Sequence, residues 1–200
     1  MFSRESVHTS GKAVPEAGTM AAAALLFAAL TGIGAVIRIP LSPVPVTMQV
    51  LFVLLSGLVL GPAWGPASQL MYLAMGACGA PFFAAPPHAG PAVLFGPTGG
   101  YLWGFVLASA AAGWIAGGDA STTERSAARA LELALAGAAG IAAIYLAGAS
   151  WLGTWLGMNG KSPLLAYRLG IRPFILIDIL KAVMAAALAW TVPRRWFGLG

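Results

Sequence analysis

The stretch from Ile39 to Gly118 contains no Asp, Glu, Lys or Arg. Soluble domains carry about a quarter of their residues as charged side chains, whereas in this chain 8% of residues are charged and 59% are hydrophobic. An uncharged stretch of this length is too long for one buried helix, and clusters of Pro and Gly divide it. Because helices satisfy their backbone hydrogen bonds within lipid, the sequence predicts a single all-α, polytopic membrane domain.

Six apolar runs along the chain have the length and composition of membrane-spanning segments. They cover approximately residues 19–37, 46–61, 64–79, 99–117, 130–152 and 173–192. Only Gly61-Pro62-Ala63 separates the second run from the third, which predicts a tight helical hairpin. We therefore expect an N-terminal tail over 1–18, a six-helix transmembrane domain over 19–193 and a C-terminal tail over 194–200.

The basic residues outside these runs predict the orientation in the membrane. With six spans, both termini lie on one side, and that side carries Arg4, Lys12, Arg125, Arg129, Arg194 and Arg195. The other side carries Arg38, Lys161, Arg168 and Arg172. The positive-inside rule then places both termini in the cytoplasm, in a multi-pass protein of the cytoplasmic membrane. The long first, third and fifth loops would face outward and surround a ligand site, whereas a five-span arrangement would reverse part of this assignment.

Asp178 and Lys181 place opposite charges inside the last apolar run. A charge at membrane depth costs about 2.5–3.5 kcal/mol on the insertion scale, so such groups are retained with a partner or a ligand. Positions three apart share one face of a helix, and Phe174 and Ala185 fall on the same face. We expect this face to point into the bundle, where the pair offers an acceptor and a donor. The alternative is an ion pair that only holds helices together.

Two further segments carry polar and aromatic residues towards the expected site. The first runs from Arg38 to Gln49 and holds three prolines in six residues, so it cannot be helical; it places Thr47 and Gln49 at the start of the second span. The second reads Leu-Phe-Gly-Pro-Thr-Gly-Gly-Tyr from Leu94 to Tyr101. Its glycines permit close backbone approach, and its hydroxyls and rings are further candidates. The candidate substrate-binding residues are Asp178, Lys181, Gln49, Thr47, Thr98, Tyr101, Phe82 and Phe95.

Motifs for chemistry on a substrate are incomplete. The Gly160-Lys161-Ser162 triplet lacks the earlier glycine of a phosphate loop, because position 155 is Trp. Ser150 lacks the second glycine of a hydrolase elbow. The two histidines lie outside the apolar runs, and Cys78 is the single cysteine. We therefore expect no enzyme activity, no metal and no cofactor. The net charge of +5 arises from residues flanking the spans, so we expect no nucleic-acid partner.

A stripe of small residues, Ala24, Ala28 and Gly32, recurs every four positions along the first span. Such a stripe lets another helix approach closely. We name it as a candidate interface with a partner subunit; packing within its own bundle is the alternative.

Three segments together resemble the BioY family, the biotin-specific substrate-binding components of energy-coupling factor (ECF) transporters. These are the segment from Arg38 to Val50, the Phe-Gly-Pro-Thr-Gly-Gly-Tyr-Leu-Trp-Gly-Phe segment around Tyr101, and Asp178-Ile-Leu-Lys181. The resemblance implies a six-helix S-component fold, extracellular capture of biotin, and an acid and a base of the last helix in the site. It also implies as partners a transmembrane coupling subunit and a pair of ATPases. The loop from Ala84 to Gly90 departs from the glycine-rich stretch that is usual in the family.

The chemistry of biotin agrees with these residues. Asp178 can accept hydrogen bonds from the ureido N–H groups, Lys181 can donate to the ureido oxygen, and aromatic rings can cover the bicycle. The carboxylate could meet Arg38, Lys161, Arg168 or Arg172, and spacing does not choose among them. The alternatives are an S-component for another small vitamin, and a structural membrane subunit.

Overall fold

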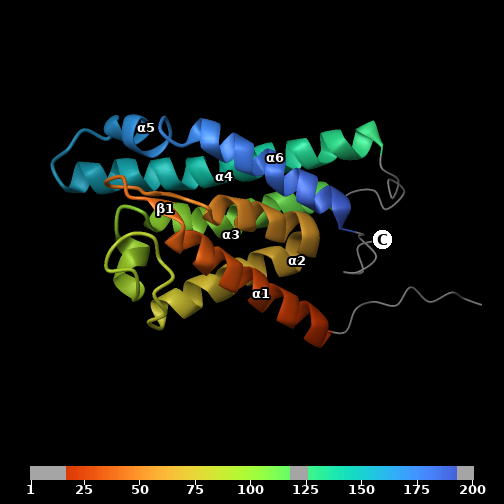
Figure 1. Ribbon diagram of the computed structural model, residues 1–200. Helices are drawn as coiled ribbons and strands as arrows, with labels where there is room; N and C mark the ends of the chain where they lie inside the picture. The colour runs from red at the N-terminus through yellow and green to blue at the C-terminus, as the bar shows by residue number, and fades with distance from the viewer. Residues whose placement is uncertain (1–16, 118–125, 193–200) are drawn as a thin grey trace, which may run out of the picture.

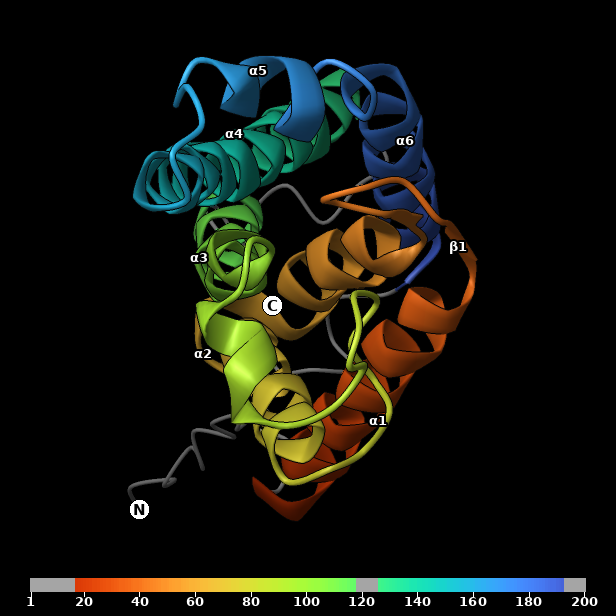
Figure 2. The same cartoon turned by 90° about the vertical axis from the view of Figure 1, so that its left-hand side faces the viewer.

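The computed structural model describes residues 17–117 and 126–192, which form a bundle of helices packed side by side (Figure 1). In chain order the elements are α1 (Ala17–Val36), β1 (Arg38–Ile39), β2 (Val46–Thr47), α2 (Gln49–Ala77), the 3-10 helix η1 (Pro91–Phe95), α3 (Gly99–Ala116), α4 (Ala127–Met158), α5 (Leu165–Gly170) and α6 (Ile175–Thr191). Viewed from the side, at 90° to Figure 1, α2 lies between α1, α3 and α6, and α4 packs against both α3 and α6 (Figure 2).

The predicted six spans are present, although two of them are joined in one element. Within the described ranges, α1, α2, α3 and α4 are each long and apolar enough to cross a membrane. Gly61 breaks α2 with φ 77° and ψ −172°, and the two halves fold back on each other: a Cβ on Gly65 would lie 2.9 Å from the Cα of Gly57. The predicted helical hairpin is therefore confirmed within α2. Helix α6, the last predicted span, has 17 residues, which is a length of about 25 Å at 1.5 Å per residue.

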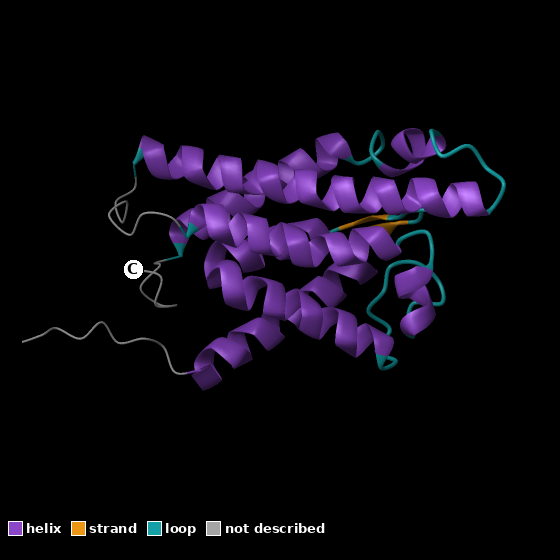
Figure 3. Ribbon diagram, turned by 180° about the vertical axis from the view of Figure 1, so that it is seen from behind, coloured by secondary structure: helices purple, strands orange, loops and turns teal. Residues whose placement is uncertain are grey.

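The elaborate connections gather at one end of the bundle. The β1–β2 hairpin, η1 and α5 lie at this end, which we call the loop end. The start of α1, the turn at Gly61 and the end of α6 lie at the opposite end (Figures 1 and 3). This arrangement agrees with the prediction that the first, third and fifth loops share one side.

The charged side chains of helix α6 face the interior of the bundle, and its large apolar side chains face outward. Asp178, Lys181, Ala185 and Ala189 are its buried residues, and Phe174, which precedes it, is also buried. Its large apolar side chains are exposed: Leu176, Leu180, Val183 and Leu188, among others. A helix surface of this kind is stable against lipid rather than water. The prediction that Phe174, Asp178, Lys181 and Ala185 share an inward face is confirmed.

Other features differ from the sequence-based expectations. Helix α4 begins at Ala127, after the N-cap Ser126, whose side chain accepts a hydrogen bond from the Arg129 amide. Arg129 was expected outside the apolar runs but lies buried in α4, where its guanidinium donates to the Ala116 carbonyl and pairs with Glu132 at 2.8 Å. Helices α5 and η1 were not predicted. Ala17 and Gly18, assigned to the N-terminal tail, belong to α1; the rest of that tail and 193–200 lie outside the described residues.

Candidate small-molecule binding site

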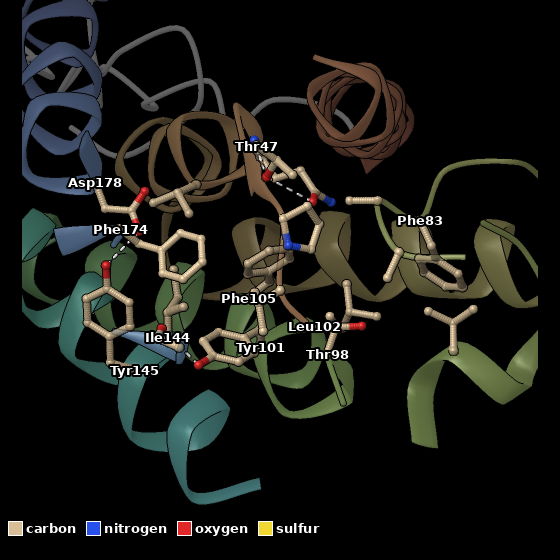
Figure 4. Close-up of a pocket in the computed structure, with 18 of the residues that line it drawn as sticks. Thr47, Phe83, Thr98, Tyr101, Leu102, Phe105, Ile144, Tyr145, Phe174 and Asp178 are labelled. Carbon is tan, nitrogen blue, oxygen red and sulfur yellow. Dashed lines mark hydrogen bonds between the residues drawn. The ribbon is translucent and has the colours of Figure 1, made fainter. Parts of the chain in front are cut away.

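A cavity lies at the loop end, between the first half of α2, α3, α4 and α6 (Figure 4). The space without atoms inside its lining amounts to about 570 Å³, including the part open to solvent. The residues that line it are Val44, Pro45, Thr47, Gln49, Val50, Phe83, Ala84, Ala85, Val93, Thr98, Tyr101, Leu102, Phe105, Ile144, Tyr145, Gly170, Phe174, Asp178 and Lys181.

Asp178 is the centre of the polar side of this cavity. The Lys181 ammonium donates to Asp178 Oδ1 at 2.7 Å, and the Tyr145 hydroxyl donates to Oδ2 at 2.7 Å. Asp178 is 5% exposed and Lys181 is 3% exposed, so water screens this pair little. Each carboxylate oxygen has further acceptor capacity and the ammonium has further protons. The group can therefore accept from a donor and donate to an acceptor of the same ligand.

A second group of polar side chains, linked by hydrogen bonds, lies at the junction between β2 and α2. The Thr47 hydroxyl donates to Gln49 Oε1 at 3.1 Å, and Gln49 Nε2 donates to the Tyr72 hydroxyl at 2.7 Å. The Tyr72 hydroxyl donates in turn to the Phe82 carbonyl at 3.1 Å. These buried groups are linked in series, so they fix the position of Gln49 and connect the hairpin to the loop that follows α2.

Aromatic rings supply the apolar walls. Tyr101, Phe83, Phe105 and Phe174 line the cavity; in Figure 4 the rings of Tyr101, Phe105 and Phe174 lie near one another, and Phe83 lies farther away. The Tyr101 hydroxyl donates to the Gly170 carbonyl at 2.9 Å, which ties α3 to α5. A Cβ on Gly170 would collide with this hydroxyl, so glycine is required for the close approach. The arrangement favours a flat or bicyclic apolar ligand that carries a few polar groups.

A family model described as the BioY family matches residues 8–197. The chain belongs to the BioY family. Three relatives align along most of their length. The probable biotin transporter BioY of Pyrococcus horikoshii is 42% identical over 82% of this chain and 90% of its own. The biotin transporter BioY of Thermotoga maritima is 41% identical over 82% and 89%, and the probable biotin transporter BioY of Lysinibacillus sphaericus is 36% identical over 82% and 81%.

The fold of this BioY family member also matches a solved structure. That structure is described as the S-component for biotin from an ECF-type ABC transporter, and it superposes with a TM-score of 0.74 at 23% sequence identity. The match covers 86% of this chain and 89% of the other. The predicted S-component fold is therefore confirmed.

Six of the eight predicted site residues line the cavity: Asp178, Lys181, Gln49, Thr47, Thr98 and Tyr101. The other two do not. Phe82 packs against α1, where a Cβ on Gly32 would meet its ring at 2.7 Å, and Phe95 is 67% exposed at the end of η1. Phe83 lines the cavity in place of Phe82. The choice between adjacent aromatics depends on the path of the loop, which periodicity does not determine.

Sequence reasoning did not assign Tyr145, Phe105 or Phe174 to the site. The sequence spacing could have indicated two of them, Phe105 and Phe174. Phe105 lies four positions after Tyr101, on the same face of α3, and Phe174 shares the inward face of α6 with Asp178. Tyr145 lies in the Ala-rich α4, and nothing local links it to Asp178. Only the packing of α4 against α6 brings these two side chains together.

The stripe of Ala24, Ala28 and Gly32 is internal. Ala24 and Ala28 are 0% exposed, and Gly32 packs against Phe82. This burial favours the alternative of packing within the bundle, and the role of the stripe as an interface with a partner subunit stays a prediction. The stripe is buried because α2 packs against α1 and Phe82 of the loop after α2 lies against Gly32.

The four basic residues considered for an anionic group differ in position. Arg38 lines a second, outer cavity beside the first, whereas Lys161, Arg168 and Arg172 line neither of these two cavities.

As for metals, no group of three His, Cys, Asp or Glu side chains that could hold an ion occurs within residues 17–117 and 126–192.

Tyr145→Phe is expected to lower the free energy of unfolding by about 1.5–3 kcal/mol, because a hydrogen bond to a charged group is lost in a buried site. Tyr167→Phe is the matched control, since Tyr167 is 62% exposed and should tolerate the change. Unfolding of the purified protein in detergent measures both. Equal stability of the two variants would show that the Tyr145 hydroxyl does not support Asp178.

Proposed function

We propose that the chain captures biotin at the outer face of the cytoplasmic membrane and serves its uptake as the substrate-binding component of an ECF-type transporter. Its relatives from Pyrococcus horikoshii and Thermotoga maritima bear names as biotin transporters, at 42% and 41% identity over most of their lengths. Binding and transport, without chemistry on the ligand, account for the residues of the site.

One observation carries the proposal. A buried acid, base and hydroxyl meet on one side of a mainly apolar cavity: Asp178, Lys181 and Tyr145. An ion pair that served only to hold helices together would need no cavity beside it. Here the pair lines a mainly apolar cavity together with several aromatic rings, which favours binding over a purely structural role.

Biotin matches this arrangement group by group. Its ureido ring carries two N–H donors and one carbonyl acceptor in a neutral ring. Asp178 supplies acceptors for the N–H groups, and Lys181 supplies a donor for the oxygen. The fused bicycle fits among Tyr101, Phe105 and Phe174, where burial of apolar surface contributes about 25 cal/mol per Å².

The orientation follows from charge. By sequence position, six basic residues lie before the first span, between the fourth and fifth spans or after the last span, and four lie in the loops of the other side. The positive-inside rule therefore favours cytoplasmic termini and a cavity that faces outward. This supports capture from the exterior, in a multi-pass protein of the cytoplasmic membrane.

Energy for transport has to come from partners in this proposal. The chain lacks a complete phosphate loop, since Trp155 occupies the position of the first glycine of the Gly160-Lys161-Ser162 triplet. A transmembrane coupling subunit and a pair of ATPases, as the S-component fold implies, would supply it. Co-purification with such subunits expressed together, and biotin uptake that depends on them, tests this part.

Biotin is expected to raise the thermal stability of the purified protein, because a ligand that binds only the folded state at 100 times its Kd stabilises it by about 2.7 kcal/mol. Thiamine, riboflavin and pantothenate at equal concentration serve as controls. A shift with one of these and none with biotin would assign the chain to another vitamin. No shift with any of them, together with no binding by calorimetry, would favour the structural alternative.

A further inference from the structure

A second cavity lies outside the first at the loop end. It is lined by residues of the β1–β2 hairpin and of the loop after α2, including Arg38, Ser42 and His88. Pro45, Ala84 and Ala85 line both cavities, so the outer space lies directly against the wall of the inner one. We call this outer space the vestibule.

The hairpin places Arg38 next to a wall residue of the inner cavity. Arg38 pairs with Thr47 in the antiparallel ladder between β1 and β2. Directly opposed residues of such a ladder project their side chains to the same face. Thr47 lines the inner cavity, and the longer side chain of Arg38 lines the vestibule beside it.

The charge of Arg38 has no carboxylate to balance it within the described part of the chain. The acidic residues of ranges 17–117 and 126–192 are Glu132 and Asp178. Glu132 pairs with Arg129 and Asp178 with Lys181. Arg38 instead contacts His88, with its Nη1 at 3.4 Å from the imidazole Nδ1.

The contact with His88 leaves the guanidinium available. His88 Nδ1 also lies 3.0 Å from the Phe83 carbonyl. If Nδ1 carries a proton, it donates to that carbonyl and cannot accept from Arg38. If it does not, the bond from Arg38 is long and uses one of five guanidinium N–H groups. In both tautomers Arg38 keeps donors for a bidentate anion.

We propose that Arg38 in the vestibule binds the carboxylate of the ligand and thereby selects ligands with an acidic tail. This rests on the proposed function, in which the ureido ring lies against Asp178 and Lys181. The pentanoate chain of biotin then extends from the inner cavity past Pro45, Ala84 and Ala85 into the vestibule. A guanidinium holds a carboxylate through two parallel hydrogen bonds, which is the geometry that favours Arg over Lys.

The test compares biotin with biotinol, in which the carboxylate is replaced by a primary alcohol, on the purified full chain by calorimetry. The wild-type protein is expected to bind biotin about tenfold more tightly than biotinol, the low end of a charge-assisted pair. Arg38→Gln should remove this preference by weakening biotin alone. Arg172→Gln, at the same end but outside both cavities, should preserve it.

Three results would overturn the inference while leaving the proposed function intact. They are equal affinity of the wild-type protein for biotin and biotinol, a preference that survives in Arg38→Gln, and an equal loss of both ligands in that variant. The wild-type comparison needs no variant, so it stands even if Arg38→Gln does not fold. Failure of the wild-type protein to bind either ligand would instead overturn the proposed function, and this inference with it.

Discussion

Lys181→Met is expected to destabilise the protein by about 3–5 kcal/mol, because it leaves the buried Asp178 carboxylate without its ion-pair partner. Methionine fills a similar volume, so the loss reports the charge rather than a cavity. The double variant Asp178→Asn/Lys181→Met removes both charges and should recover most of the lost stability. Equilibrium unfolding in mixed detergent micelles gives the free energy of unfolding of the wild-type protein, of Lys181→Met and of the double variant.

The same pair is expected to control binding. Asp178→Asn should weaken biotin affinity tenfold or more, since a hydrogen bond to a charged group contributes about 1.5–3 kcal/mol. The double variant should be as weak or weaker despite its recovered stability. Lys161→Met is the control, because Lys161 is exposed and lines neither cavity. Unchanged biotin affinity in Asp178→Asn would remove Asp178 from the site.

Gly57→Ala is expected to destabilise the bundle by about 1–3 kcal/mol, the range for overpacking a tight interior. A Cβ at Gly57 would collide with the Ser109 carbonyl oxygen, which belongs to the backbone of α3. The two helices would have to separate, and both carry walls of the binding cavity. The expected result is a lower Tm in detergent, together with weaker biotin binding.

Gly153→Ala provides the comparison for that change. Gly153 lies inside α4, and a Cβ there would be 3.5 Å from its nearest neighbour, the Pro163 carbonyl oxygen, which is an ordinary contact. Alanine is the better helix former by about 1 kcal/mol, so this variant should be as stable as the wild-type protein or more so. A Gly57→Ala protein that matched Gly153→Ala would show that α2 and α3 are not closely packed at Ser109.

Much of the fold could be predicted because it depends on local patterns. The uncharged stretch from Ile39 to Gly118 required a membrane domain, and Gly61-Pro62 marked the break that turns α2 back on itself. The three-residue spacing of Asp178 and Lys181 placed both on one helix face. Since lipid cannot solvate an ion pair, that face had to turn inward, and the structure shows that it does.

The remaining assignments depended on contacts between segments far apart in the sequence. Tyr145 reaches Asp178 only because α4 packs against α6. The loop after α2 directs Phe83 inward and Phe82 onto Gly32, although the two rings are adjacent in sequence. The same loop covers Gly32, the last member of the stripe in α1, although the small-residue spacing of that stripe permits close packing with any helix.

The sequence by itself determined that this chain enters a membrane, where its apolar helices lie, and which face of the last helix is polar. Those properties follow from solvation, which acts on each segment separately. The tertiary structure alone decided that Phe83 and not Phe82 lines the cavity, which hydroxyl supports the acid, and that Arg38 lines the vestibule. These depend on how helices and loops pack against one another, and a local pattern does not specify a distant partner.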